Sequence, residues 1–173
     1  MIMCGRLLAG TLALLIVVNL SAQAVYADTP QPISGTLFKG PAVGGISVFV
    51  SPSVLQVRDE VGYGTVTGGV LTGSAVYTFN EQVINFVHQS GTLHGQVVIT
   101  TTSGSTITLG LTGVFSGVTP TAPTIAITGT WVVLSVSGPD ARLQGQGQFT
   151  AVVIFQQGPH FGETQGAFSG LIH

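Results

Sequence analysis

The amino-acid sequence predicts an all-β protein: a single small antiparallel β-barrel of roughly eight strands, with a β-sandwich as the alternative. Three observations support this prediction. Apolar and polar side chains alternate with the period of two that is typical of strands through much of the chain. Beyond the N-terminal apolar run, no window shows the helical period. Turn signals rich in glycine separate the alternating segments at spacings of about 8–15 residues.

The N-terminal segment is expected to lie outside this fold, as a signal peptide covering residues 1–27. Arg6 supplies a positive charge, and residues 7–20 form an apolar run. Small residues follow, so cleavage is expected after Ala24 or Ala27. A retained membrane anchor is the alternative, although the run is short for a membrane span.

The remaining domain, residues 28–173, is then secreted, either extracellular or periplasmic, with no stable membrane span. Cys4 is the only cysteine and precedes this domain, so a core without disulfides must hold it together. Without Arg6 the domain has three basic and six acidic side chains, a net charge of −3. This balance offers no basic patch, which argues against nucleic acid as a partner. Charged residues make up only 6% of the chain, against about a quarter in ordinary globular proteins.

Candidate strands follow one another along this domain, and several of the connections between them carry turn residues. Gly40-Pro41 is expected to close the first strand, Arg58-Asp59-Glu60 to form an exposed loop, and Asn80-Glu81 to form a turn. Residues 62–69 are glycine-rich and predict either a turn or a bulged strand. The predicted strands cover residues 33–38, 46–50 with 54–57, 71–79, 83–88, 93–101, 107–115, two longer segments within 124–155, and 166–172.

The clearest pattern is a hairpin within residues 124–155, whose two strands are joined by Ser137-Gly138-Pro139-Asp140. After this turn the side chains divide by parity, as they do on a strand with one dry and one wet face. The dry parity holds Ala141, Leu143, Gly145, Gly147, Phe149, Ala151, Val153 and Phe155, and the wet parity holds Arg142, Gln144, Gln146, Gln148 and Thr150.

A recurring pattern of glycine, large residue and glycine favours the barrel over the sandwich. The pattern occurs around Leu93, Phe115 and Phe168, each of which has glycine two positions before and after it. All three members share one face of a strand. Alternating small and large residues on an inward face fit the taper of a tight barrel, and glycine permits the coiling needed for closure.

The C-terminal hairpin resembles those of allene oxide cyclase and dirigent-type barrels, including secreted bacterial proteins of that class. The resemblance rests on Leu143-Gln-Gly145-Gln-Gly147-Gln-Phe149, after a strand bearing Gly129-Thr-Trp131, and covers roughly residues 77–172. It implies an eight-stranded barrel with an apolar cavity, often trimeric and free of cofactors. The usual Gly-Thr-Gly turn is Gly138-Pro139-Asp140 here, and the family's cavity carboxylate and cyclase residues match no position. No activity is therefore carried over.

No motif in the sequence points to a catalytic or metal site. No HxH, HExxH or CxxC spacing is present, so neither a metal nor a cofactor is expected. No serine lies in a Gly-x-Ser-x-Gly elbow, the motif of a serine nucleophile. Glu81 and Glu163 lie in expected turns, so they are poor candidates for the carboxylate pair of a glycosidase. The only histidines are His88, His94, His160 and His173.

The leading functional hypothesis is non-catalytic binding of a small hydrophobic ligand at the barrel mouth, in a pocket lined by Phe86, His88, Trp131 and Phe149. The alternative is a structural or surface-assembly protein that acts through its uncharged face rich in threonine and glutamine, with a homo-oligomer (a trimer, by the resemblance) as the partner state. A cofactor-free cyclase-type enzyme and a small outer-membrane barrel rank third. A small barrel filled by its own side chains would have no pocket.

Overall fold

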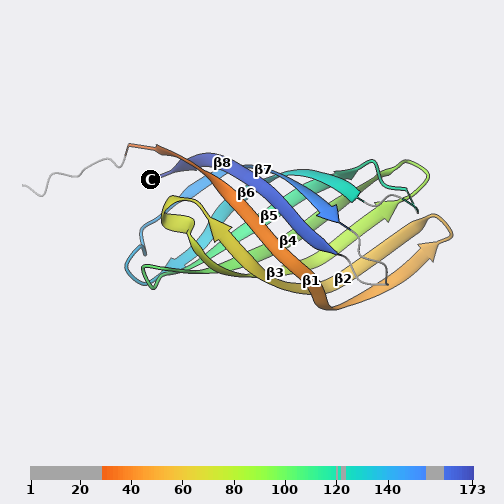
Figure 1. The fold of residues 1–173 in the computed structure, drawn as a ribbon, viewed down its shortest axis with the longest axis horizontal. Helices are drawn as coiled ribbons and strands as arrows, with labels where there is room; N and C mark the ends of the chain where they lie inside the picture. Colours follow the sequence, from red (N-terminus) through yellow and green to blue (C-terminus); the bar gives the residue numbers. More distant parts are fainter. Residues whose placement is uncertain (1–28, 120, 122–123, 155–161) are drawn as a thin grey trace, which may run out of the picture.

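The computed structural model describes residues 29–119, 121, 124–154 and 162–173 (Figure 1). The expected signal peptide lies outside these residues, as do Phe155 and His160. Eight antiparallel strands each pair with their neighbours in sequence, and β1 pairs with β8 to close the ring. The predicted all-β barrel is thus confirmed. Among the described residues the one helix is a single 3-10 turn, and none is long and apolar enough to cross a membrane.

The strands are long, and they form an elongated barrel in which both described chain ends lie at one end (Figure 1). Their bounds are β1 (Gln31–Ser51), β2 (Val54–Thr67), β3 (Gly73–Asn85), β4 (Ser90–Thr101), β5 (Thr106–Ser116), β6 (Thr124–Ser137), β7 (Gly145–Ile154) and β8 (Glu163–Ile172), with the 3-10 turn η1 (Gly69–Leu71) between β2 and β3. The β6–β7 hairpin is present as predicted, except that its turn extends to Gln144.

Two predicted connections in the first half of the chain are wrong. Gly40-Pro41 does not end a strand: β1 runs through it, with register shifts against β2 between Lys39 and Ile46. Asn80-Glu81 does not form a turn: β3 continues through it, with an irregularity between Phe79 and Glu81. Glycine, proline and asparagine occur in the bulges of long, twisted strands as well as in turns. These residues therefore gave a wrong turn prediction here.

The expected exposed loop at Arg58-Asp59-Glu60 is also wrong, because all three residues belong to β2. Asp59 has a positive φ of 53°, and both neighbours keep their pairing with β3. This local bulge changes the parity of the strand. Arg58 and Asp59 therefore face solvent while Glu60 points into the barrel, where it is only 2% exposed.

Aromatic rings lying over glycines fill the barrel interior. A Cβ atom on Gly170 would lie 2.5 Å from Trp131 Cζ2, and one on Gly129 would lie 2.6 Å from Phe149 Cζ. The inner glycines therefore provide the space that the rings occupy, a known way of covering glycine in sheets. The small-large-small pattern around Leu93 and Phe168 lies on this inner face, with both large residues buried.

Candidate functional site

The cavities that lie inside the barrel among the described residues are small. Two spaces, each of about 30 Å³, lie among its side chains. A drug-sized ligand usually occupies a pocket of roughly 300–1,000 Å³. The core would have to repack to admit one. The buried Tyr77 hydroxyl donates to the Thr65 carbonyl (3.3 Å), and burial raises the pKa of Tyr77, as expected in a dry interior.

The four residues predicted to line a pocket are not brought together. Trp131 and Phe149 are buried and border the same small cavity. Phe86 is half-buried against Phe49, with ring centroids 6.2 Å apart, and His88 is exposed. Ligand binding inside the barrel stays a prediction, and the two interior spaces given above would have to enlarge for it.

A side-chain cap explains why Phe86 and His88 leave the barrel wall. The predicted strand 83–88 is instead the end of β3, which stops at Asn85. The Asn85 side-chain oxygen accepts hydrogen bonds from the backbone N–H groups of Val87 and His88, both at 3.0 Å. This Asx-type turn reverses the chain before His88 can continue the alternation.

The interior contains one charged cluster that sequence reasoning missed: Lys39, Glu60 and Gln82, hereafter the ion-pair cluster. Lys39 Nζ lies 2.7 Å from Glu60 Oε1, and Gln82 Nε2 donates to Glu60 Oε2 at 2.8 Å. All three side chains are almost fully buried. A signal was available, because Lys39 falls on the same parity as the apolar Ile33 and Leu37 of β1.

The ion-pair cluster is satisfied within itself. Lys39 Nζ also lies 5.8 Å from the centroid of the Phe79 ring, a cation–π distance. Among the described residues, no buried side-chain nitrogen or oxygen lacks a hydrogen-bond partner. The cavity beside Lys39 has only about 30 Å³, too small for a substrate. The cluster therefore fills part of the barrel interior, and its two opposite charges neutralise each other.

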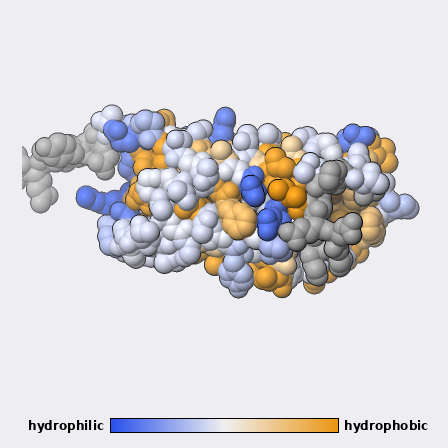
Figure 2. All heavy atoms as spheres, viewed as in Figure 1, coloured by the Kyte–Doolittle hydropathy of each residue, from blue (hydrophilic) through white to orange (hydrophobic). Residues whose placement is uncertain are grey.

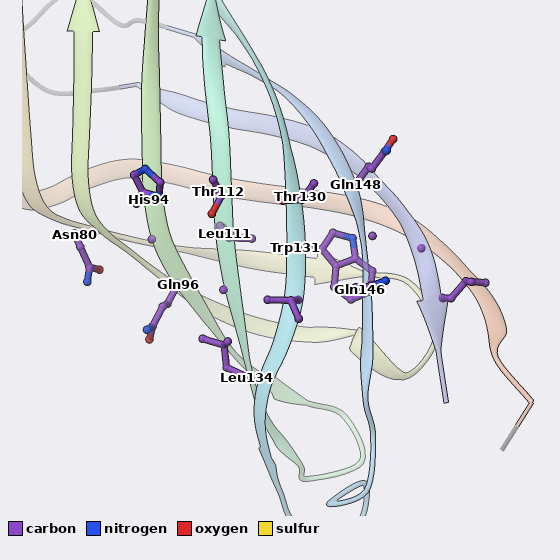
Figure 3. Close-up of a pocket in the computed structure, with 16 residues that line it drawn as sticks. Asn80, His94, Gln96, Leu111, Thr112, Thr130, Trp131, Leu134, Gln146 and Gln148 are labelled. Carbon is purple, nitrogen blue, oxygen red and sulfur yellow. The ribbon is translucent and has the colours of Figure 1, made fainter. Parts of the chain in front are cut away.

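Two wide hollows lie on the outer wall. One, of about 850 Å³, crosses the outer faces of β4 to β8. His94, Thr112, Thr130 and Gln148 form a cross-strand row through it, because each pairs with the next in register (Figure 3). The lining comprises Asn80, His94, Gly95, Gln96, Gly110, Leu111, Thr112, Thr130, Trp131, Val132, Leu134, Gln146, Gly147, Gln148, Gly170 and Leu171.

A second hollow, of about 1,050 Å³, continues the first toward the chain ends. It lies where β6 runs on beyond its last pair with β7, Val132 with Gln146. The two hollows share four lining residues and form one channel, hereafter the wall groove. The shared residues are Val132, Leu134, Gln146 and Leu171.

The wall groove combines an amide and hydroxyl rim with apolar patches. The first hollow is lined by no Lys, Arg, Asp or Glu. Val132, Leu134 and Leu171 are about half exposed within it. Leu134 is there because of a β6 irregularity, and it leans over Gly110, where a Cβ would lie 3.2 Å from its Cδ1. Figure 2, which views the side where β1 and β8 lie in front, shows pale residues interspersed with orange, hydrophobic ones and a few blue, hydrophilic ones.

The carboxylate of Asp140 has a structural partner set. Asp140 Oδ2 accepts hydrogen bonds from Ser103 Oγ (2.8 Å) and Ser105 Oγ (2.7 Å), which ties the β6–β7 turn to the β4–β5 turn. The Ser105 and Ser103 hydroxyls lower the pKa of Asp140. Within the part of the chain that the structure describes, no three His, Cys, Asp or Glu side chains cluster as a metal site.

No family model, curated protein or solved structure matches this chain. The resemblance to allene oxide cyclase and dirigent-type barrels therefore stays a prediction. The site must be interpreted from its own chemistry.

Proposed function

We propose that this protein is a non-catalytic binding protein that holds an uncharged, hydroxyl-rich chain, a saccharide, in the wall groove. One observation carries the proposal: two adjoining hollows lie on the outer wall, the first lined by amides, hydroxyls and apolar side chains without Lys, Arg, Asp or Glu, and the second lined mainly by apolar side chains with Arg142 as its one strongly basic residue. The proposal keeps the predicted binding role but moves the site from the barrel mouth to the wall.

The chemistry of the groove matches both surfaces of a sugar ring. Each glutamine amide both donates and accepts hydrogen bonds, as a sugar hydroxyl does. Gln96 lies on β4, whereas Gln146 and Gln148 lie on β7, with β5 and β6 between them in one continuous sheet that fixes their spacing. The half-exposed Val132 and Leu171 can cover the C–H face of a ring. A charged ligand would find no opposite charge in the first hollow.

The length of the groove favours an oligosaccharide over a single sugar as the ligand. The first hollow alone lies within the usual range for ligand sites, roughly 300–1,000 Å³. The second hollow adjoins it through shared residues, so one chain can occupy both. The outer wall mixes exposed threonine and glutamine with exposed valine and leucine, and the interior is mainly apolar. A transmembrane barrel has a polar lumen instead, so the apolar interior supports an aqueous role for this wall.

Titration of the protein with a panel of neutral oligosaccharides, followed by calorimetry and by amide NMR shifts, tests the proposal. We expect shifts along the wall groove and roughly tenfold weaker binding for Gln146→Ala, which removes one rim amide. Gln165→Ala is the matched control, since Gln165 is an exposed β8 glutamine that lines neither hollow of the groove. Equal weakening by both variants, or no binding by any neutral sugar, would contradict the proposal.

Native mass spectrometry separates this proposal from ligand binding inside the barrel. We expect protein purified from its host to carry no apolar small molecule. A retained apolar molecule released only on unfolding would return the site to the interior.

A second candidate is homo-oligomerisation through the same wall. Val132, Leu134 and Leu171 expose apolar surface inside a polar rim, which is the composition of a subunit interface. Leu134→Lys would then dissociate the oligomer, whereas the saccharide proposal expects no change in oligomeric state.

A further inference from the structure

The most exposed apolar segment of the molecule is the second half of β1, not the wall groove. Residues 42–51, hereafter the edge segment, include Val43, Ile46, Val48, Phe49 and Val50, each between 51% and 65% exposed. Both faces of the strand are exposed here. The edge segment contains no charged residue and no proline.

Within the described residues, the edge segment is paired along one side only. On one side it pairs with β2, from Ala42 with Gly62 to Ser51 with Val54. On the other side, the pairing of β1 with β8 ends at Lys39 with Thr164. Among the described residues, no strand pairs with that side of residues 42–51. Figure 1 shows the β1–β2 hairpin reaching beyond the rest of the barrel at the end opposite the chain termini.

Soluble proteins normally protect such an edge. Lysine, proline, a short strand or a covering loop keeps unpaired N–H and C=O groups from pairing with another chain. Register shifts against β2 are another such device, and the edge segment has them, with Pro41 directly before it. Its apolar side chains and its lack of charge still give it the character of a template for strand addition.

We propose that the edge segment pairs antiparallel with the same segment of a second copy of this chain, which joins two barrels through a continuous sheet. A two-fold interface brings the same patch of each copy together. On the outer face, Ile46 and Val48, which pair with Arg58 and Gln56, would then meet the apolar side chains of the other copy. Phe49, which pairs with Leu55, would do so on the inner face.

The size and charge of the edge segment favour a second copy. Its five large apolar residues each expose roughly 100 Å², so two copies present about 1,000 Å² together, and burial of most of this surface would approach the lower bound of a specific interface. A self-pairing interface needs no opposite charge, and this segment has none. The described chain ends, at Thr29 and His173, lie at the other end of the barrel (Figure 1).

Sedimentation of the wild-type protein over a concentration range of about a hundredfold, reaching ~100 μM, is the first test. We expect a reversible monomer–dimer equilibrium. Val48→Lys should raise the dissociation constant roughly tenfold or more, because two lysines would face one another across the pair. The matched control is Val114→Lys, on the outer wall of β5, because Val48 and Val114 are both 51% exposed.

The outcomes separate this proposal from its rivals. A dimer that survives Val48→Lys but dissociates on Val114→Lys or Leu134→Lys would place the interface on the wall and overturn the proposal. A wild-type monomer at every concentration would overturn it as well. The monomeric Val48→Lys protein should bind oligosaccharide with unchanged affinity per groove, so failure of the edge proposal and failure of the saccharide proposal are distinguishable.

Hydrogen exchange on the wild-type protein gives a test that requires no variant to fold. Amides of the edge segment that are not bonded to β2 should exchange more slowly as protein concentration rises. Exchange that does not depend on concentration, in a sample that sediments as a dimer, would exclude the edge segment from the interface.

Discussion

The barrel body and the edge segment are built from similar residues and differ in what surrounds them. In the body, each strand has a partner on both sides and buries one face, as Val97 and Ile99 of β4 do. In the edge segment, Val48 and Val50 belong to a strand with one partner and no buried face. Apolar residues form a strand in both regions, but they form a core only where the sheet closes into the barrel. The apolar surface of the edge segment is therefore available for binding, whereas that of the body is used for stability.

The largest effect should come from breaking the ion-pair cluster in the body. Lys39→Met leaves Glu60 buried with Gln82 but without its cation, and loss of one partner of a buried pair costs about 3–5 kcal/mol. Urea unfolding measures the loss. Arg58→Met, at an exposed site on the neighbouring strand, is the control and should stay within about 0.5 kcal/mol. Equal stability of the two variants would show that the buried charges do not contribute.

A pair of glycine substitutions compares the two regions directly. Gly170→Ala in the body places a methyl group 2.5 Å from Trp131 Cζ2, and we expect a loss of about 1–3 kcal/mol from overpacking. Gly44→Ala in the edge segment meets no atom within 4 Å and should leave stability unchanged or raise it by about 0.4–1 kcal/mol. Thermal unfolding measures both. A larger loss for Gly44→Ala would mean that the edge segment is packed against something in solution.

Local opening should differ between the regions in dilute solution, where the protein is monomeric. The amides of Val97 and Ile99 lie in a strand paired on both sides, and they should exchange only on global unfolding. Amides along residues 46–50 should exchange by local fraying. Hydrogen exchange followed by NMR measures the contrast, and uniform protection of both regions would contradict it.

The smallest effect concerns Asp140, which joins two turns at the end of the barrel opposite the edge segment. Its pKa in the folded protein lies below the ordinary value of 3.8, so its ionised form stabilises the fold. This contribution is complete above pH 3.8 and is lost as the pH falls through the lower folded value. Stability measured across this acid range should fall less steeply in a Ser103→Ala/Ser105→Ala variant, which lacks the two hydroxyl donors. An unchanged slope of stability against pH would show that Asp140 does not contribute to the loss of stability in acid.

Sequence pattern was sufficient where strands alternate regularly, and it failed where they bulge. The inward parity of Phe149, Ala151 and Val153 on β7 is confirmed by their burial. Glu60 and His88 were misplaced for opposite reasons. A bulge at Asp59 turned Glu60 inward, and a side-chain cap from Asn85 ended the strand before His88.

The wall groove could not have been predicted from pattern, because it depends on how strands are registered. Gln96, Gly110, Val132 and Gln146 are spread over fifty residues of sequence and become neighbours only through strand pairing. The amides of β7 were visible as a polar face, but the hollow beside them comes from Gly110 and from the early end of the β6–β7 pairing. Neither the position of Gly110 beside these amides nor the end of the β6–β7 pairing can be predicted from the alternation within one strand.

The seam between β1 and β8 has a consequence for folding kinetics. Seven of the eight pairings join consecutive strands, whereas the seam joins residues as distant as Gln31 and Ile172. Contacts between distant residues carry the greater loop-closure entropy, so we expect the sheet to grow as a meander and the seam to close last. Seam substitutions would then accelerate unfolding in stopped-flow experiments and leave the folding rate nearly unchanged. The edge segment is the part of β1 that lies beyond this seam, so among the described residues closure of the seam leaves it with β2 as its one partner strand.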